Sequence, residues 1–134
     1  MGGASALIFS ARHPEKVKAV CDVFGITDFI RFYEESDYKA SISNAYGGTP
    51  DEHKEYYMER SAVNLMGKYY GKNFMVIHGN QDVIVPKWHS DILVEKMRNS
   101  NIAVEYLVVR GIGHENRIIK GMEDKVLNFF DGHK

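Results

Sequence analysis

The chain has 134 residues, enough for one domain that buries about two thirds of the surface exposed by its unfolded chain. Its hydrophobic fraction of 44%, charged fraction of 26% and net charge of −1 are those of an ordinary globular protein and do not favour binding to nucleic acid or to a membrane. No apolar run approaches the ~20 residues that span a bilayer. The first residues lack a signal-peptide pattern, so we expect a cytoplasmic location.

The chain opens on a helical pattern. Ala4, Leu7, Ile8 and Ala11 recur at helical spacing, and Pro14 ends the helix. No strand leads into this helix, although α/β units run from strand to turn to helix. We therefore expect the chain to begin in the middle of such a unit.

A short strand is predicted next, over residues 17–24, and Gly25 ends it. It contains the single cysteine, Cys21, which excludes an internal disulfide and a zinc site with several cysteines. We expect Cys21 to be a core residue. The following residues, about 26–72, are polar and aromatic and exceed what a plain crossover needs. We expect a helical insertion there that covers part of the substrate, although most of its aromatic residues are expected simply to cover the sheet.

The second predicted strand, 74–77, is short and rich in β-branched residues, which is typical of a buried strand. The chain then turns through Gly79 and Asn80, presents Asp82, and starts a helix at Pro86. Acids at the carboxyl ends of strands commonly belong to the functional site of open α/β sheets. At this point Asp82 is equally well explained as a turn residue.

A third predicted strand, 103–109, leads into a glycine-rich loop with His114 and a closing helix over 118–130. This alternation predicts an α/β fold: a three-stranded parallel half-sheet with flanking helices, in one partial domain over 1–134. Loops after neighbouring parallel strands share one edge of the sheet, so Asp82 and His114 should lie close together. A carboxylate beside an imidazole fixes its tautomer and makes the histidine a competent general base.

Such a pair needs a serine or cysteine within hydrogen-bond reach for nucleophilic catalysis. Ser5 is followed by Ala6 and Leu7 instead of the glycine that a sharp strand-to-helix turn requires. It also lies inside the first helical pattern. The chain therefore offers no obvious nucleophile.

Two other kinds of site are weakly indicated. The glycines at 111 and 113 resemble a dinucleotide site, but Asn116 replaces the third glycine. A metal site on His78, Asp82, His89 and His114 lacks a spacing that would fix its geometry. We expect neither a cofactor nor a metal.

The motifs together resemble a known family. His-Gly-x-x-Asp-x-x-Val-Pro at 78–86 and Gly-His at 113–114, with Met-Gly-Gly-Ala-Ser-Ala-Leu at 1–7 and His-Pro-Glu at 13–15, resemble the C-terminal half of an α/β-hydrolase. The pattern is closest to the prolyl oligopeptidase-like peptidases and esterases, and it covers essentially the whole chain. The resemblance implies that Asp82 and His114 are the acid and base of a serine triad, which hydrolyses an ester or peptide bond through an acyl-enzyme.

The chain departs from this family at its start. There the motif Gly-x-Ser-x-Gly-Gly carries the nucleophile, and residues 1–3 match only its last three positions. By the resemblance, Met1 holds the place whose N–H donates to the oxyanion hole. We expect a C-terminal fragment of a serine hydrolase, of the peptidase or carboxylesterase type, which lacks the serine and is inactive alone. The alternative is a non-catalytic interaction or assembly module built on a remnant of this fold.

The same departure predicts a partner surface. In the family, the strand at 17–24 pairs with the strand that leads into the nucleophile turn, so here it would offer an open edge. We expect self-association, or pairing with a separate N-terminal half, through this edge. The substrate of the full-length parent would be an ester or a peptide.

Overall fold

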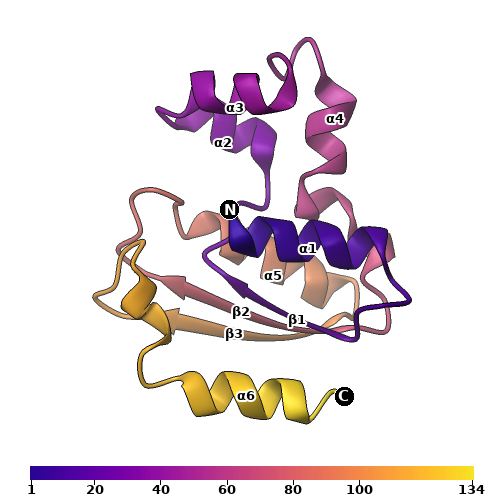
Figure 1. The fold of residues 1–134 in the computed structure, drawn as a ribbon, viewed down its shortest axis with the longest axis vertical. Helices are drawn as coiled ribbons and strands as arrows, with labels where there is room; N and C mark the ends of the chain where they lie inside the picture. Colours follow the sequence, from indigo (N-terminus) through magenta and orange to yellow (C-terminus); the bar gives the residue numbers. More distant parts are fainter.

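A computed structural model describes residues 1–134 and shows three parallel strands that alternate with helices (Figure 1). The strand order is β1-β2-β3, so β2 lies in the centre. The expected α/β fold with a three-stranded parallel sheet is therefore confirmed. The strands are β1 (Ala19–Val23), β2 (Asn73–Gly79) and β3 (Ala103–Val109).

Six α-helices and three 3-10 helices accompany the sheet. None of them is both long and apolar enough to cross a bilayer. The α-helices are α1 (Gly2–Arg12), α2 (Phe29–Glu35), α3 (Lys39–Tyr46), α4 (Lys54–Glu59), α5 (Trp88–Asn99) and α6 (Glu123–Asp131). The 3-10 helices are η1 (Ala62–Asn64), η2 (Met66–Lys68) and η3 (Asn116–Ile119).

The central strand β2 is buried on both faces because helices cover both sides of the sheet. Phe74 and Val76 pack with side chains of α1 and α5, whereas Met75 and Ile77 pack with Phe129 of α6. Figure 1 shows this arrangement, with α1 and α5 on one side of the sheet and α6 on the other. The alternation of side chains along a strand thus divides the sheet core into two layers.

The segment between β1 and β2 folds into α2, α3, α4 and two 3-10 helices. The sequence predicted that most of its aromatic side chains cover the sheet. In the structure they largely form a cluster of their own. Phe29, Phe32 and Tyr57 are buried there with Val85, and only Tyr69 joins the core on the sheet. This cluster positions the wall of the pocket described below.

Several boundaries differ from the expected ones. The first strand covers 19–23 instead of 17–24, because Phe24 has a positive φ of 41° that ends the extended conformation. The closing helix is divided into η3 and α6 by Gly121, which has a φ of 82°. Cys21 was expected in the core; it is half-buried and packs against the core layer that contains Phe129 of α6.

Candidate active site

Asp82 and His114 meet at the carboxyl-end edge of the sheet. The Nδ1 of His114, in the loop after β3, donates to Oδ2 of Asp82, in the loop after β2, at 2.8 Å. The Asp82 side chain is fully buried, and 25% of the His114 side chain is exposed. Because Nδ1 carries the proton for Asp82, Nε2 keeps a lone pair that can accept a proton.

Hydrogen bonds join the two loops directly. The N–H of Gln81 donates to the carbonyl of Ile112 at 2.9 Å, and the N–H of Gly111 donates to Oδ1 of Asn80 at 2.8 Å. A Cβ atom on Gly79 would lie 2.2 Å from the Ile112 carbonyl oxygen, so only glycine permits this approach. The residues Gly79 and Asn80 therefore fix the distance between the Asp82 loop and the His114 loop.

Asp82 is both a turn residue and the partner of the histidine. Its Oδ1 accepts the N–H groups of Ile84 and Val85, each at 2.9 Å, which forms an Asx-type turn before α5. Its Oδ2 is left for His114. Asp82 can therefore stabilise the turn and hold His114 at the same time, since each contact uses a different oxygen.

A buried serine–histidine pair lies behind Asp82. Ser90 Oγ is 2.6 Å from His78 Nδ1, and His78 Nε2 donates to the Val85 carbonyl at 2.9 Å while it lies 3.4 Å from Asp82 Oδ2. His78 and Ser90 have no exposed surface, so no substrate can reach them. Burial lowers the pKa of His78 despite the nearby carbonyl and carboxylate. We interpret this pair as support for the Asp82 loop, a role that the sequence analysis missed although a histidine ends a buried strand there.

The possible metal site is not formed. His89 lies on α5, where its Nδ1 accepts the N–H of Thr27 at 3.2 Å, and burial lowers its pKa to about 3. No group of three or more His, Cys, Asp or Glu side chains is arranged to hold a metal ion. His78, Asp82, His89 and His114 therefore do not act together as ligands.

The possible dinucleotide site is also not formed. The glycine-rich loop after β3 leads into the 3-10 helix η3 instead of the α-helix whose N-terminus would receive a pyrophosphate. A Cβ atom on Gly113 would lie 3.3 Å from the carbonyl oxygen of Gln81. These glycines allow the two site loops to approach each other.

Phe24 contacts the histidine from the end of β1. Its ring centroid lies 4.2 Å from that of His114, and its backbone has the left-handed φ of 41° already noted. For a bulky residue this conformation is uncommon and unfavourable. This contact packs the Phe24 ring against the His114 ring, and no pattern in the sequence predicted it.

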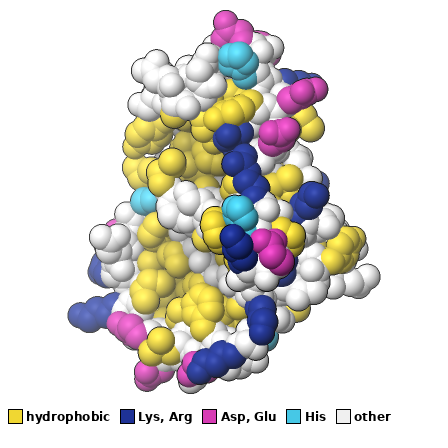
Figure 2. Space-filling model, turned by 45° about the vertical axis from the view of Figure 1, so that its right-hand side comes forward, with side chains coloured by type: hydrophobic (Ala, Val, Ile, Leu, Met, Phe, Trp, Pro, Cys, Tyr) yellow, Lys and Arg dark blue, Asp and Glu magenta, His cyan; other side chains and the backbone are white.

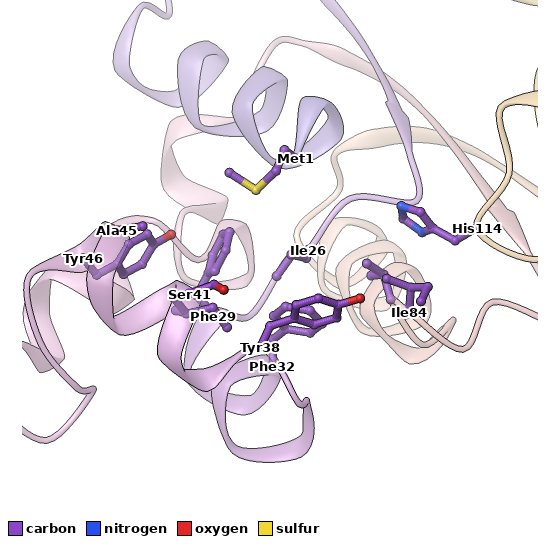
Figure 3. A pocket seen from close by; sticks show the side chains of 12 residues that line it. Met1, Ile26, Phe29, Phe32, Tyr38, Ser41, Ala45, Tyr46, Ile84 and His114 are labelled. Carbon is purple, nitrogen blue, oxygen red and sulfur yellow. The ribbon is translucent and has the colours of Figure 1, made fainter.

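An apolar pocket of about 390 Å³ opens beside His114. Ten of its twelve lining residues are hydrophobic. Figure 3 shows His114 and Ile84 on one side, and Phe29 and Tyr46 on the other, with Met1 above. Met1 precedes α1, and 76% of its surface is exposed. The structure thus brings Met1 and His114 to one cavity, and Asp82 is hydrogen-bonded to His114 outside its lining.

No serine or cysteine side chain hydrogen-bonds to His114, whose one hydrogen-bond partner is Asp82. Ser5 is exposed on α1, and the hydroxyl of Ser10 donates to the carbonyl of Leu7. Ser41 lines the pocket, but Figure 3 shows it across the cavity from His114. In this structure none of these hydroxyl groups is hydrogen-bonded to His114.

Known proteins resemble this chain in sequence and in fold. The peptidase YtmA of Bacillus subtilis (strain 168), itself uncharacterized, is 33% identical over 82 residues, which are 60% of this chain and 32% of YtmA. The structure of Porphyromonas gingivalis dipeptidyl peptidase 4 matches 99% of this chain with a TM-score of 0.82 at 20% identity, and 18% of that protein is covered. A puromycin hydrolase matches 98% of the chain with a TM-score of 0.82 at 18% identity, and 20% of it is covered.

An esterase has the same fold. A truncated carbohydrate esterase from gut microbiota matches 84% of this chain with a TM-score of 0.67 at 24% identity, and 42% of it is covered. The chain thus spans about a third of its curated relative and about a fifth of the two peptidase structures. The sequence model that describes the prolyl oligopeptidase family matches residues 1–133 of this chain. The chain therefore belongs to the prolyl oligopeptidase family, which has the α/β-hydrolase fold and relates it to the serine hydrolases.

Proposed function

We propose that this chain supplies the acid and the base of a serine-hydrolase active site. The observation that carries the proposal is the 2.8 Å hydrogen bond from His114 Nδ1 to Asp82 Oδ2, at the mouth of an apolar pocket. Asp82 orients the imidazole and stabilises its charged form, and His114 is the general base and then the general acid. Membership of the prolyl oligopeptidase family supports these roles.

The proposed reaction follows from this geometry. A serine hydroxyl attacks the carbonyl carbon of an ester or amide, and its proton passes to Nε2 of His114. The C–O or C–N bond then breaks, and the leaving group takes that proton. Water repeats the two steps on the acyl-enzyme and returns the serine. We propose that the nitrogen of Met1, at the positive end of α1, contributes to stabilising the oxyanion.

The pocket favours an apolar group on the substrate. Phe29, Phe32 and Ile84 line it together with His114, and ten of its twelve lining residues are hydrophobic. Burial of an aromatic or large aliphatic side chain there contributes about 25 cal/mol per Å² of apolar surface. We therefore propose a peptide or ester whose acyl component carries such a side chain.

We propose that the 134-residue chain is inactive alone, because no serine or cysteine contacts His114. A fluorophosphonate probe and an activated ester should give neither labelling nor turnover with the purified chain. Stoichiometric labelling, or turnover that His114→Ala abolishes, would show that a nucleophile is present after all.

A chimera tests the catalytic roles directly. The part of YtmA that aligns before Met1 of this chain would be joined to its amino end, with labelling by fluorophosphonate as the readout. We expect labelling, and a decrease of about 10³-fold or more in ester turnover for His114→Ala. His53→Ala, at an exposed histidine before α4, is the matched control and should leave turnover unchanged. A folded chimera without any labelling would favour the non-catalytic interaction module.

We further propose that the edge of β1 binds another strand. The N–H of Phe24 donates to Ile77 in β2, so by alternation Ala19, Cys21 and Val23 direct their backbone groups away from the sheet. Figure 2 shows hydrophobic side chains gathered at the level of the sheet and α6. Self-association, or pairing with a separate N-terminal segment, would satisfy these groups. Sedimentation as a monomer at micromolar concentration would contradict self-association. The cytoplasmic location of the protein stays a prediction.

A further inference from the structure

The carboxyl group of Asp22 is fully buried and has no hydrogen-bond partner at either oxygen. It lies on β1 two residues after Val20, so it faces the same side of the sheet, towards α1. Burying a polar group without a partner is unfavourable, and such a group in a folded protein calls for a physical reason. The catalytic proposal does not use Asp22.

The carboxyl group fills the space where α1 begins. A Cβ atom on Gly3 would lie 2.1 Å from Asp22 Oδ1, and a Cβ atom on Gly25 would lie 2.2 Å from it. The Gly25 position is also only 3.0 Å from the backbone nitrogen of Ala4. Asp22 is therefore enclosed between the first turn of α1 and the turn after β1, and both glycines are needed to make room for it.

The amino end of α1 lacks any other negative partner. Met1 makes no side-chain cap to the helix, and the first turn contains no acidic residue. The first N–H groups of a helix have no partners within it and carry partial positive charge. A carboxyl group beneath this turn is the counterpart that the helix itself does not supply.

Few titratable groups face Asp22. The Met1 ammonium group approaches from α1, Tyr69 approaches from the segment before β2, and Cys21 adjoins it on β1. The Tyr69 hydroxyl donates to the Leu7 carbonyl at 3.3 Å, so it is engaged with α1. Burial raises the pKa of Asp22 to about 7, against the nearby Gly25 N–H and the Met1 ammonium group. The charge of Asp22 therefore changes near neutral pH.

We propose that Asp22 is a positioning residue: its carboxyl group anchors the first turn of α1 to β1 and thereby sets where Met1 lies in the pocket that it shares with His114. The anchoring is independent of the catalytic proposal. Only the consequence for the oxyanion rests on that proposal. Asp22 holds the helix end more firmly in its neutral form, because burial without a hydrogen-bond partner disfavours the carboxylate more than the helix N–H groups and the Met1 ammonium group favour it.

The test is hydrogen exchange of the 134-residue chain at pH 6 and pH 8, corrected for intrinsic rates. Amides of residues 5–8, bonded across the first turns of α1, are compared with those of β2. In the native chain, protection of α1 relative to β2 should decrease about fivefold from pH 6 to pH 8, because opening of the first turn exposes Asp22 and lets it lose its proton. Asp22→Asn keeps the shape and one acceptor, so it should retain the protection seen at pH 6 and lose its pH dependence. Asp22→Leu should lose about fivefold in α1 protection at both pH values.

A purely space-filling role predicts a different result. In that case the relative protection of α1 would not change with pH, and Asp22→Asn would match the native chain at both pH values, which would overturn the proposal. If Asp22→Leu does not fold, the pH dependence in the native chain and its loss in Asp22→Asn decide alone. Because the readout is exchange and not turnover, an inactive chimera leaves this inference standing.

Discussion

Two buried aspartates serve adjacent strands of one sheet in opposite ways. Asp82, after β2, has three donors on its two oxygens, from Ile84, Val85 and His114. Asp22, within β1, has none on either oxygen. At the Asp82 loop, hydrogen bonds determine the structure and leave the histidine oriented. At the start of α1 no such bond exists; the buried carboxyl group itself anchors the helix, and burial raises its pKa to about 7. Variants at the glycines and carboxylates of the two regions separate these two causes.

The largest effect is expected at the Asp82 region, for Gly79→Ala. The new Cβ atom would meet the backbone of Ile112, which cannot move without separating β2 from the β3 loop. We expect a loss of about 3 kcal/mol in the free energy of unfolding, measured by urea denaturation. Gly67→Ala is the control, because nothing lies within 4 Å of its Cβ position. Equal effects of the two substitutions would show that the loops do not depend on this close approach.

Asp82→Ala is expected to be next in size. It leaves the N–H groups of Ile84 and Val85 without their acceptor, and Val85 is buried. The free energy of unfolding should fall by about 2 kcal/mol. Asp82→Asn keeps one oxygen for these two donors and should lose clearly less, while His114 loses its carboxylate partner. If thermal denaturation gave the two variants equal losses, the His114 contact and not the turn would be the main stabilising interaction.

The corresponding change at α1 should be smaller, because the nearest atom is a side-chain oxygen. Gly3→Ala brings a Cβ atom against Asp22 Oδ1 and should destabilise the chain by about 1.5 kcal/mol. Gly2→Ala has open space and should be neutral or slightly stabilising, since alanine favours helices. Adding Asp22→Ala should recover part of the Gly3→Ala loss in a double-mutant cycle. Strict additivity would contradict direct contact between the two positions.

Acidification should reveal opposite slopes in the two regions. Asp22 has a pKa of about 7 instead of 3.8, so the folded chain binds its proton first and its contribution to stability rises as the pH falls through 7. His89 has a pKa of about 3 instead of 6.5, so the unfolded chain binds its proton first and stability is lost below 6.5. Burial lowers the pKa of His78 as well, which adds to the second slope.

Between pH 6.5 and about pH 5.5 these slopes largely cancel in the native chain. Each amounts to about 1 kcal/mol over this interval. On acidification, Asp22→Asn should therefore lose about 1 kcal/mol in the free energy of unfolding, and His89→Asn should gain about as much. Urea denaturation at the two pH values measures both. If the free energy of unfolding changed in the same direction with pH in both variants, Asp22 and His89 would not have the shifted pKa values that burial gives them.

Much of the site could be predicted because it depends on local order. The turn through Gly79 and the carboxyl-end position of Asp82 follow from the residues between a buried strand and a helix. The pairing with His114 follows from a rule about parallel strands. The pocket wall was foreseen only as a helical insertion, since its aromatic residues pack on one another and on Val85, which no periodicity indicates.

The sequence by itself determined the parallel sheet, the order of its motifs and the meeting of Asp82 with His114, because hydrophobic periodicity and strand direction act over short stretches of chain. Only the tertiary structure decided the state of each polar group. Thr27 binds His89 across 62 positions, and Asp22 lies under a helix that precedes its own strand. Burial and hydrogen-bond partners set proton affinity and access, and both come from segments that only the fold brings together.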